Sequence, residues 1–78
     1  MAILSNAQVA NKVRGAAAEK RIRQADIAVE LSMSEMAVSR RMKGDTPFSP
    51  EELSRIAALL DVPVATFFGE HATRGVAA

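Results

Sequence analysis

The stretch MSEMAVSRRMKG, residues Met33 to Gly44, places three cations beside apolar side chains in one short run. Ser34 is a preferred helix N-cap, because its hydroxyl accepts hydrogen bonds from the free N–H groups of the first turn. Gly44 is a preferred stop, because glycine adopts a left-handed backbone without a steric penalty. The stretch therefore predicts a helix over residues 35–43, with Ser34 before its start and Gly44 after its end.

At about 100° per residue, the predicted helix has two faces. One arc gathers the side chains of Glu35, Met36, Ser39, Arg40 and Lys43. The opposite arc gathers those of Ala37, Val38 and Met42. We expect the second arc to enter a core and the first to meet a polar partner.

Arg41 lies inside the apolar arc, where a buried guanidinium without a partner would be too costly. We expect this side chain to extend along its aliphatic stem until the charged end finds a partner. That partner is either a phosphate or an acid such as Glu51 or Glu52, and the sequence does not choose between them.

Two helices are predicted before the stretch. Ser5 and Gln8 form an S-x-x-Q capping box for a first helix that runs to about Lys20. Gly15 lies inside that helix at a cost of about 1 kcal/mol relative to alanine, and we expect it to permit close approach of another helix. A second, brief helix is predicted over residues 24–31.

Two more helices are predicted after the stretch. The segment FSPEEL, residues 48–53, places serine at the cap, proline at the first helical position and glutamate at the third. Its Phe48 and Leu53 are positioned for a hydrophobic staple across the cap. A fifth, short helix is expected over residues 64–68. The inward-facing residues of the flanking helices are Val9, Val13, Ala16, Ala17, Ile27, Ala28, Leu31, Leu53, Ile56, Ala57 and Leu60.

The period of the apolar residues defines the fold class. Nothing alternates at period two for long enough to indicate a strand, so we expect an all-α fold of five short helices. The chain has 78 residues, which is the size of one small domain.

The formal net charge of +1 is unevenly distributed. Residues 1–44 hold eight cations and four anions, a net charge of +4, whereas residues 45–78 hold two cations and five anions, a net charge of −3. Such segregation suggests a polyanion on one side of the molecule. Ordinary solvated surface explains it equally well, so charge by itself does not decide.

The composition disfavours several other classes of protein. There is no cysteine, which excludes disulfides and thiolate metal sites, and His71 has no second ligand at useful spacing. We therefore expect no metal and no cofactor. The N-terminus MAILSNAQ lacks the features of a signal peptide, and the longest apolar stretch is too short to span a bilayer. Neither a catalytic histidine pairing nor a glycine-rich phosphate loop is present, so we expect a soluble protein that is not an enzyme.

The order and spacing of these features resemble the phage repressor and Cro-type helix-turn-helix DNA-binding domains. The similarity covers roughly residues 13–68 and includes Gln24 at the start of the second helix, LSMS at the turn, VSR in the third helix and the closing IAALLDVPVATFF. Ser32 stands where relatives often have glycine, and Arg41 where they usually have an apolar residue. The resemblance implies a compact five-helix lambda-repressor-like domain over residues 1–69, followed by a frayed tail over residues 70–78.

In that family the helix after the turn enters the major groove and reads base edges with its N-terminal half. The resemblance therefore assigns base contacts to four residues: Glu35, Met36, Ser39 and Arg40. We place five further residues on the DNA backbone: Arg23, Gln24, Ser34, Arg41 and Lys43.

Each base-contacting residue also has a simpler explanation. Arg40 can donate two hydrogen bonds to guanine, or it can be an ordinary solvent-exposed cation. Glu35 can accept from cytosine N4, or it can only complement the positive end of its own helix. Met36 can pack on a thymine methyl group or fill a gap in the core, and Ser39 can bind DNA or simply lie on the helix surface.

The resemblance implies a sequence-specific DNA-binding transcriptional regulator, a phage or prokaryotic repressor acting on double-stranded operator DNA. It also implies the cytoplasm of a prokaryotic cell or phage-infected host, no membrane partner and a possible homodimer through residues 62–68. The alternative is a protein-interaction module of the antitoxin type that uses the same fold. Its surface would combine the acids of the last third with an exposed Phe67 or Phe68.

Overall fold

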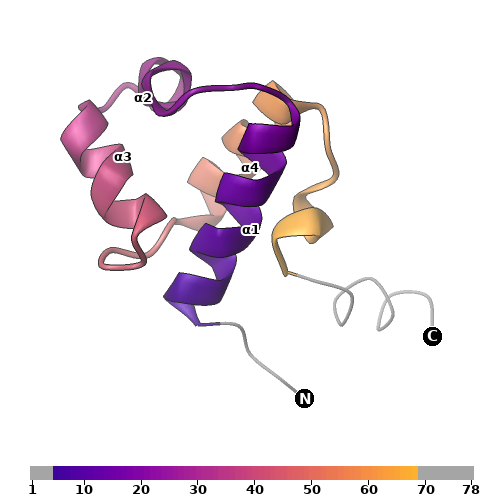
Figure 1. Ribbon diagram of the computed structural model, residues 1–78, viewed down its shortest axis with the longest axis horizontal. Coiled ribbons are helices and arrows are strands. Elements are labelled where there is room, and N and C mark those ends of the chain that lie inside the picture. The colour runs from indigo at the N-terminus through magenta and orange to yellow at the C-terminus, as the bar shows by residue number, and fades with distance from the viewer. Residues whose placement is uncertain (1–4, 69–78) are drawn as a thin grey trace.

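The computed structural model describes residues 5–68 of the chain (Figure 1). Over that range the fold is all-α and contains no strand, as predicted. The elements are α1 (Asn6–Glu19), α2 (Gln24–Leu31), α3 (Glu35–Met42), α4 (Pro50–Leu60) and the 3-10 helix η1 (Val64–Phe68). The fifth helix is thus a 3-10 helix, in which Thr66 N–H donates to the Pro63 carbonyl at 3.0 Å. The predicted tail over residues 70–78 lies outside the described residues.

Serine side chains cap three of the helices at their predicted positions. Ser5, Ser34 and Ser49 each accept a hydrogen bond from the backbone N–H three residues later, at 3.1 to 3.2 Å. In α1 and α4 the bond is reciprocated, because Gln8 and Glu52 accept from the backbone N–H of the capping serine. Both predicted capping boxes are therefore confirmed.

All four α-helices end in the same left-handed turn. The residue with positive φ is Arg21 (59°), Ser32 (55°), Gly44 (84°) or Asp61 (59°). In each case the next N–H donates to the carbonyl five residues before it, which is the Schellman pattern. Gly44 was predicted as a left-handed stop, and the family resemblance pointed to Ser32, where relatives often have glycine. Nothing in the sequence singled out Arg21 or Asp61, which are not typical left-handed residues.

The helices enclose one hydrophobic core. Its buried members come from every element: Val13, Ala16, Ala17, Ile27, Ala28, Leu31, Val38, Met42, Phe48, Leu53, Ile56, Ala57, Leu60 and Phe67. Residues that follow three of the left-handed turns (Ile22, Met33 and Val62) pack against this core from the outside. The predicted inward faces are confirmed, with Val9 only half-buried.

The long helix α1 positions α3 within this arrangement. In Figure 1, α3 and η1 lie on opposite sides of α1, and both pack against it. At Gly44, directly after α3, a Cβ atom would lie 2.9 Å from the Cα of Ala7. Gly44 is therefore required both by its left-handed backbone and by the close approach of α1.

Gly15 differs from Gly44, and the expectation for it was wrong. A Cβ atom built on Gly15 would have no atom within 4 Å, and the residue is exposed. No neighbouring helix approaches Gly15 among residues 5–68, because this position faces away from the core.

Candidate nucleic-acid interface

The helix α3 has the two faces that its sequence predicted. Val38 and Met42 are buried, with 0% and 7% of their surface exposed, whereas Ala37 of the predicted inner arc is only half-buried. On the outer side the exposed residues are Glu35, Met36, Arg40 and Lys43, while Ser39 is half-buried. The outer face therefore presents all four predicted base-contacting side chains at least partly to solvent.

The N-terminus of α3 brings three predicted DNA contacts together. Gln24, the first residue of α2, donates from Nε2 to the Glu35 carbonyl at 3.4 Å. Ser34 caps the same turn, and Glu35 is the acid of that first turn. Glu35 therefore also complements the positive end of the helix dipole, which is its simpler role.

Met36 and Arg40 lie along one another on the outer face of α3. Arg40 Nη2 is 3.8 Å from Met36 Sδ, a contact between residues one helical turn apart. Met36 is 66% exposed, so it does not fill a gap in the core. Arg40 forms no ion pair with any residue in the range 5–68. Both side chains are thus free to meet a partner from outside.

Arg23 and Lys43 are exposed cations on either side of these residues in the sequence. Arg23 precedes α2 and pairs with Asp26, with Nε and Oδ2 3.7 Å apart, but its side chain remains 83% exposed. Exposed pairs of this kind contribute little to stability, so the pairing does not prevent Arg23 from meeting a phosphate. Lys43 is the C-cap of α3.

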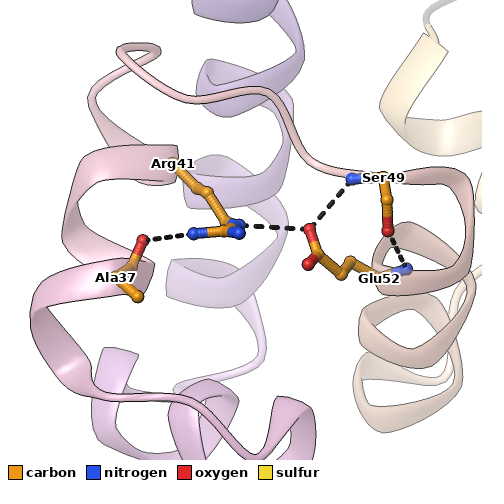
Figure 2. Close-up of polar contacts among 4 residues, drawn as sticks. All are labelled: Ala37, Arg41, Ser49 and Glu52. Atoms are coloured by element: carbon orange, nitrogen blue, oxygen red, sulfur yellow. Dashed lines mark hydrogen bonds and ion pairs between the residues drawn. The ribbon is translucent and has the colours of Figure 1, made fainter.

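Arg41 is half-buried and contacts α4, whereas the other cations, Arg40 and Lys43, are exposed. Its Nε donates to Oε1 of Glu52 at 3.1 Å, and its Nη1 donates to the Ala37 carbonyl at 3.0 Å (Figure 2). Of the partners that the sequence left open, the structure therefore contains Glu52. Only 19% of each of the two side chains is exposed.

Arg14 of α1 also holds α3, and sequence reasoning missed it. Its Nη1 donates to the carbonyl of Met42, the last residue of α3, while its Nη2 donates to Asn11 Oδ1. Carbonyls at a helix C-terminus have no partner within the helix, so a cation there is favourable. The three-residue spacing of Asn11 and Arg14 is a signal that could have indicated their contact within α1, but no sequence signal points to Met42.

The part of the chain that the structure describes holds neither a metal-binding cluster nor a membrane-spanning helix. No group of three or more histidine, cysteine, aspartate or glutamate side chains is arranged to hold a metal ion there. None of the helices over residues 5–68 has the length and apolar character needed to cross a bilayer.

Comparison with known proteins identifies the class of domain. A family model described as helix-turn-helix matches residues 12–67, a range that contains α2, the turn and α3. Because this match covers most of the chain, the protein belongs to the helix-turn-helix family. That family is one of DNA-binding domains, typically non-enzymatic, and membership supports a DNA-binding transcription regulator in general. A search of the curated proteins finds no match.

Proposed function

We propose that the protein is a sequence-specific DNA-binding transcriptional regulator, a repressor of the phage or prokaryotic type, whose α3 reads the major groove. The observation that supports this most directly is the outer face of α3. Met36 is 66% exposed there, and Arg40 has no ion pair within residues 5–68. Neither side chain contributes to the core, whereas a base-lined groove offers a partner to both.

The proposed base contacts follow from the chemistry of the exposed side chains. Arg40 donates two hydrogen bonds to guanine O6 and N7, and Met36 packs against a thymine methyl group. Ser39 and Glu35 supply the remaining contacts, with Glu35 accepting from cytosine N4.

The proposed backbone contacts surround this face. Gln24 and Ser34 lie at helix N-termini, where free N–H groups favour a phosphate. Arg23 and Lys43 add positive charge, and both side chains are exposed. Arg41 was also assigned to the backbone from the sequence, but its guanidinium pairs with Glu52 of α4.

Salt dependence tests this proposal. Sites are first selected by the protein from a random pool of double-stranded DNA, and affinity is then measured at rising salt. We expect log K to fall by about 0.9 for each phosphate neutralised. Lys43→Ala should weaken binding to every sequence alike and reduce the salt slope by about 1. Arg55→Ala removes a charge outside the proposed interface and should leave the slope unchanged.

The second candidate is a protein-interaction module of the antitoxin type. It is favoured by η1, where Val64 and Phe68 remain 40% and 38% exposed, although Phe67 is fully buried. The same surface is the candidate contact for a homodimer, which would present two α3 helices about 34 Å apart. Gel-shift titrations at low and high salt separate the two functions, since an interaction module binds DNA weakly at both.

A further inference from the structure

The ion pair between Arg41 and Glu52 differs from the other two ion pairs found among residues 5–68. It joins two elements, α3 and α4, whereas the Arg23–Asp26 and Arg55–Glu51 pairs are local, three and four residues apart. It is also the least exposed, with 19% of each side chain accessible. A pair shielded from water is screened less than a surface pair, so it holds its two elements more firmly.

The guanidinium of Arg41 is fixed at two points. Its Nε donates to Glu52 at 3.1 Å, and its Nη1 donates to the carbonyl of Ala37, one turn earlier in the same helix, at 3.0 Å (Figure 2). Because the guanidinium is planar and rigid, two directional hydrogen bonds define the orientation of its plane.

The carboxylate of Glu52 is itself held by the start of α4. Its Oε1 accepts from the Ser49 backbone N–H at 2.9 Å, and Ser49 Oγ accepts from the Glu52 backbone N–H at 3.1 Å (Figure 2). The same carboxylate oxygen thus completes the capping box and receives Arg41. Arg41 is therefore attached to a fixed point on α4 and not to a mobile surface acid.

This attachment affects how α3 is rotated about its own axis. The inner face of α3 buries only Val38 and Met42, and hydrophobic contact is non-directional. Gln24 and Arg14 bind backbone carbonyls at the two ends of α3. The tie at Arg41, about 100° around the helix from Arg40, adds a directional side-chain contact that restricts the direction in which Arg40 points.

We propose that Arg41 is a positioning residue for DNA reading: through Glu52 it sets the rotation of α3 relative to α4, and so the base selectivity of Arg40, and it does not bind a phosphate. This inference rests on the proposed DNA-binding function. It assigns a purpose to an arginine that lies inside the apolar arc of its helix.

Two variants break or weaken the tie while preserving the rest of the site. Arg41→Met removes both hydrogen bonds but keeps an apolar stem of similar length. Glu52→Gln weakens the tie by replacing the ion pair with a neutral hydrogen bond, because the amide oxygen still accepts from Arg41. It keeps the capping box, since glutamine also serves at the third helical position. Each protein is titrated against the site that the wild-type protein selects from random DNA and against single-base variants of that site, at several salt concentrations. Circular dichroism confirms that each variant is folded.

If Arg41 positions α3, the variants should discriminate less well between bases, while the salt dependence of binding should stay the same. Arg41→Met should lose about fivefold in discrimination at the base read by Arg40, and Glu52→Gln a smaller factor, with the salt slope unchanged for both. The double variant should lose no more than Arg41→Met alone, because that substitution already removes the tie. Arg41→Lys, which keeps the charge but not the rigid fork, should fall between the wild type and Arg41→Met.

A phosphate-binding Arg41 predicts a different result and would overturn the inference. Arg41→Met would then weaken binding to all sequences alike and lower the salt slope by about 1. Arg41→Lys would retain most of the affinity, and Glu52→Gln would strengthen binding, because it removes a negative charge from a protein that binds a polyanion.

The pair formed by Arg55 and Glu51 supplies a matched control. These residues have the same chemistry and lie 3.2 Å apart, but both belong to α4. Arg55→Met and Glu51→Gln should leave base discrimination unchanged, and losses equal to those at Arg41 would overturn the inference. If the wild-type protein selects no DNA site, the proposed function fails and the inference with it. If the wild-type protein selects a site, and the Arg41 and Glu52 variants discriminate between its single-base variants as well as the wild type does, the inference alone fails.

Discussion

The helices α3 and α4 differ in how they are capped, how many of their residues are buried and where their charged side chains find partners. In α4 a complete capping box opens the helix, four residues of one face are buried, and the outer face carries its own ion pair between Glu51 and Arg55. In α3 a single serine bond caps the helix, and only Val38 and Met42 are buried.

The ends of α3 are held by other elements. Gln24 of α2 binds its first turn, Arg14 of α1 binds its last carbonyl, and Glu52 of α4 binds Arg41. The outer residues Met36 and Arg40 are left without a partner beyond each other among residues 5–68. The sequence of α4 therefore serves folding, whereas α3 is supported by other elements and leaves its outer face exposed.

The largest expected effect belongs to α4. Leu60 is 2% exposed, so Leu60→Ala should lower the free energy of unfolding by about 2–5 kcal/mol through lost burial and a cavity. Chemical denaturation followed by circular dichroism measures this loss. Base selectivity should be unchanged at temperatures where the variant is folded. If neither Leu60→Ala nor Leu53→Ala lowered the free energy of unfolding, α4 would not make the contribution to folding that distinguishes it from α3.

The junction after α3 should show the next largest effect on folding. Gly44→Ala introduces a side chain at a φ of +84° and places its Cβ 2.9 Å from Ala7, so both the turn and α1 must adjust. We expect a loss of roughly 1–3 kcal/mol in the free energy of unfolding, measured by denaturant titration. An unchanged midpoint would mean that this contact between α1 and the turn is not maintained in solution.

Substitutions on the outer face of α3 should change the affinity for DNA but not the stability of the fold. Arg40→Ala should weaken binding to the preferred site by about 1–3 kcal/mol and abolish the preference for guanine at one position. Its thermal melting temperature should match that of the wild type. Titration against a panel of single-base variants measures the change. In the Arg41 variants the same guanine should remain the preferred base, with weaker discrimination. If Arg41 instead determines which base is preferred, α3 is rotated from the orientation proposed above.

The smallest expected effect is a gain in stability. Gly15 is helical and exposed, and a Cβ there meets nothing within 4 Å. Gly15→Ala should therefore raise the free energy of unfolding by about 0.5–1 kcal/mol through the better helix propensity of alanine. Together with Gly44→Ala it forms a matched pair of glycine substitutions with opposite signs. A loss of stability at Gly15 would indicate a contact that the fold does not show.

Much of the fold could be predicted from residues close together in the sequence. The caps at Ser5, Ser34 and Ser49 and the stop at Gly44 were all predicted and confirmed. Each depends on hydrogen bonds and backbone preferences within about one turn of helix, which the local sequence specifies. Helical periodicity likewise predicted the buried and exposed faces of α3.

Only the tertiary structure decided the partners of side chains that reach another element. Arg41 and Glu52 are 11 residues apart, and Arg14 and Met42 are 28 apart, so their contacts depend on how whole helices pack. For Arg41 the sequence showed that a partner was necessary, because the apolar arc could not accept an unpaired charge. It left a phosphate, Glu51 and Glu52 as equals, since local spacing carries no information about the position of α4 relative to α3. Packing of both helices on the common core brings Glu52 within hydrogen-bonding distance, and that geometry, not the local sequence, pairs Arg41 with it.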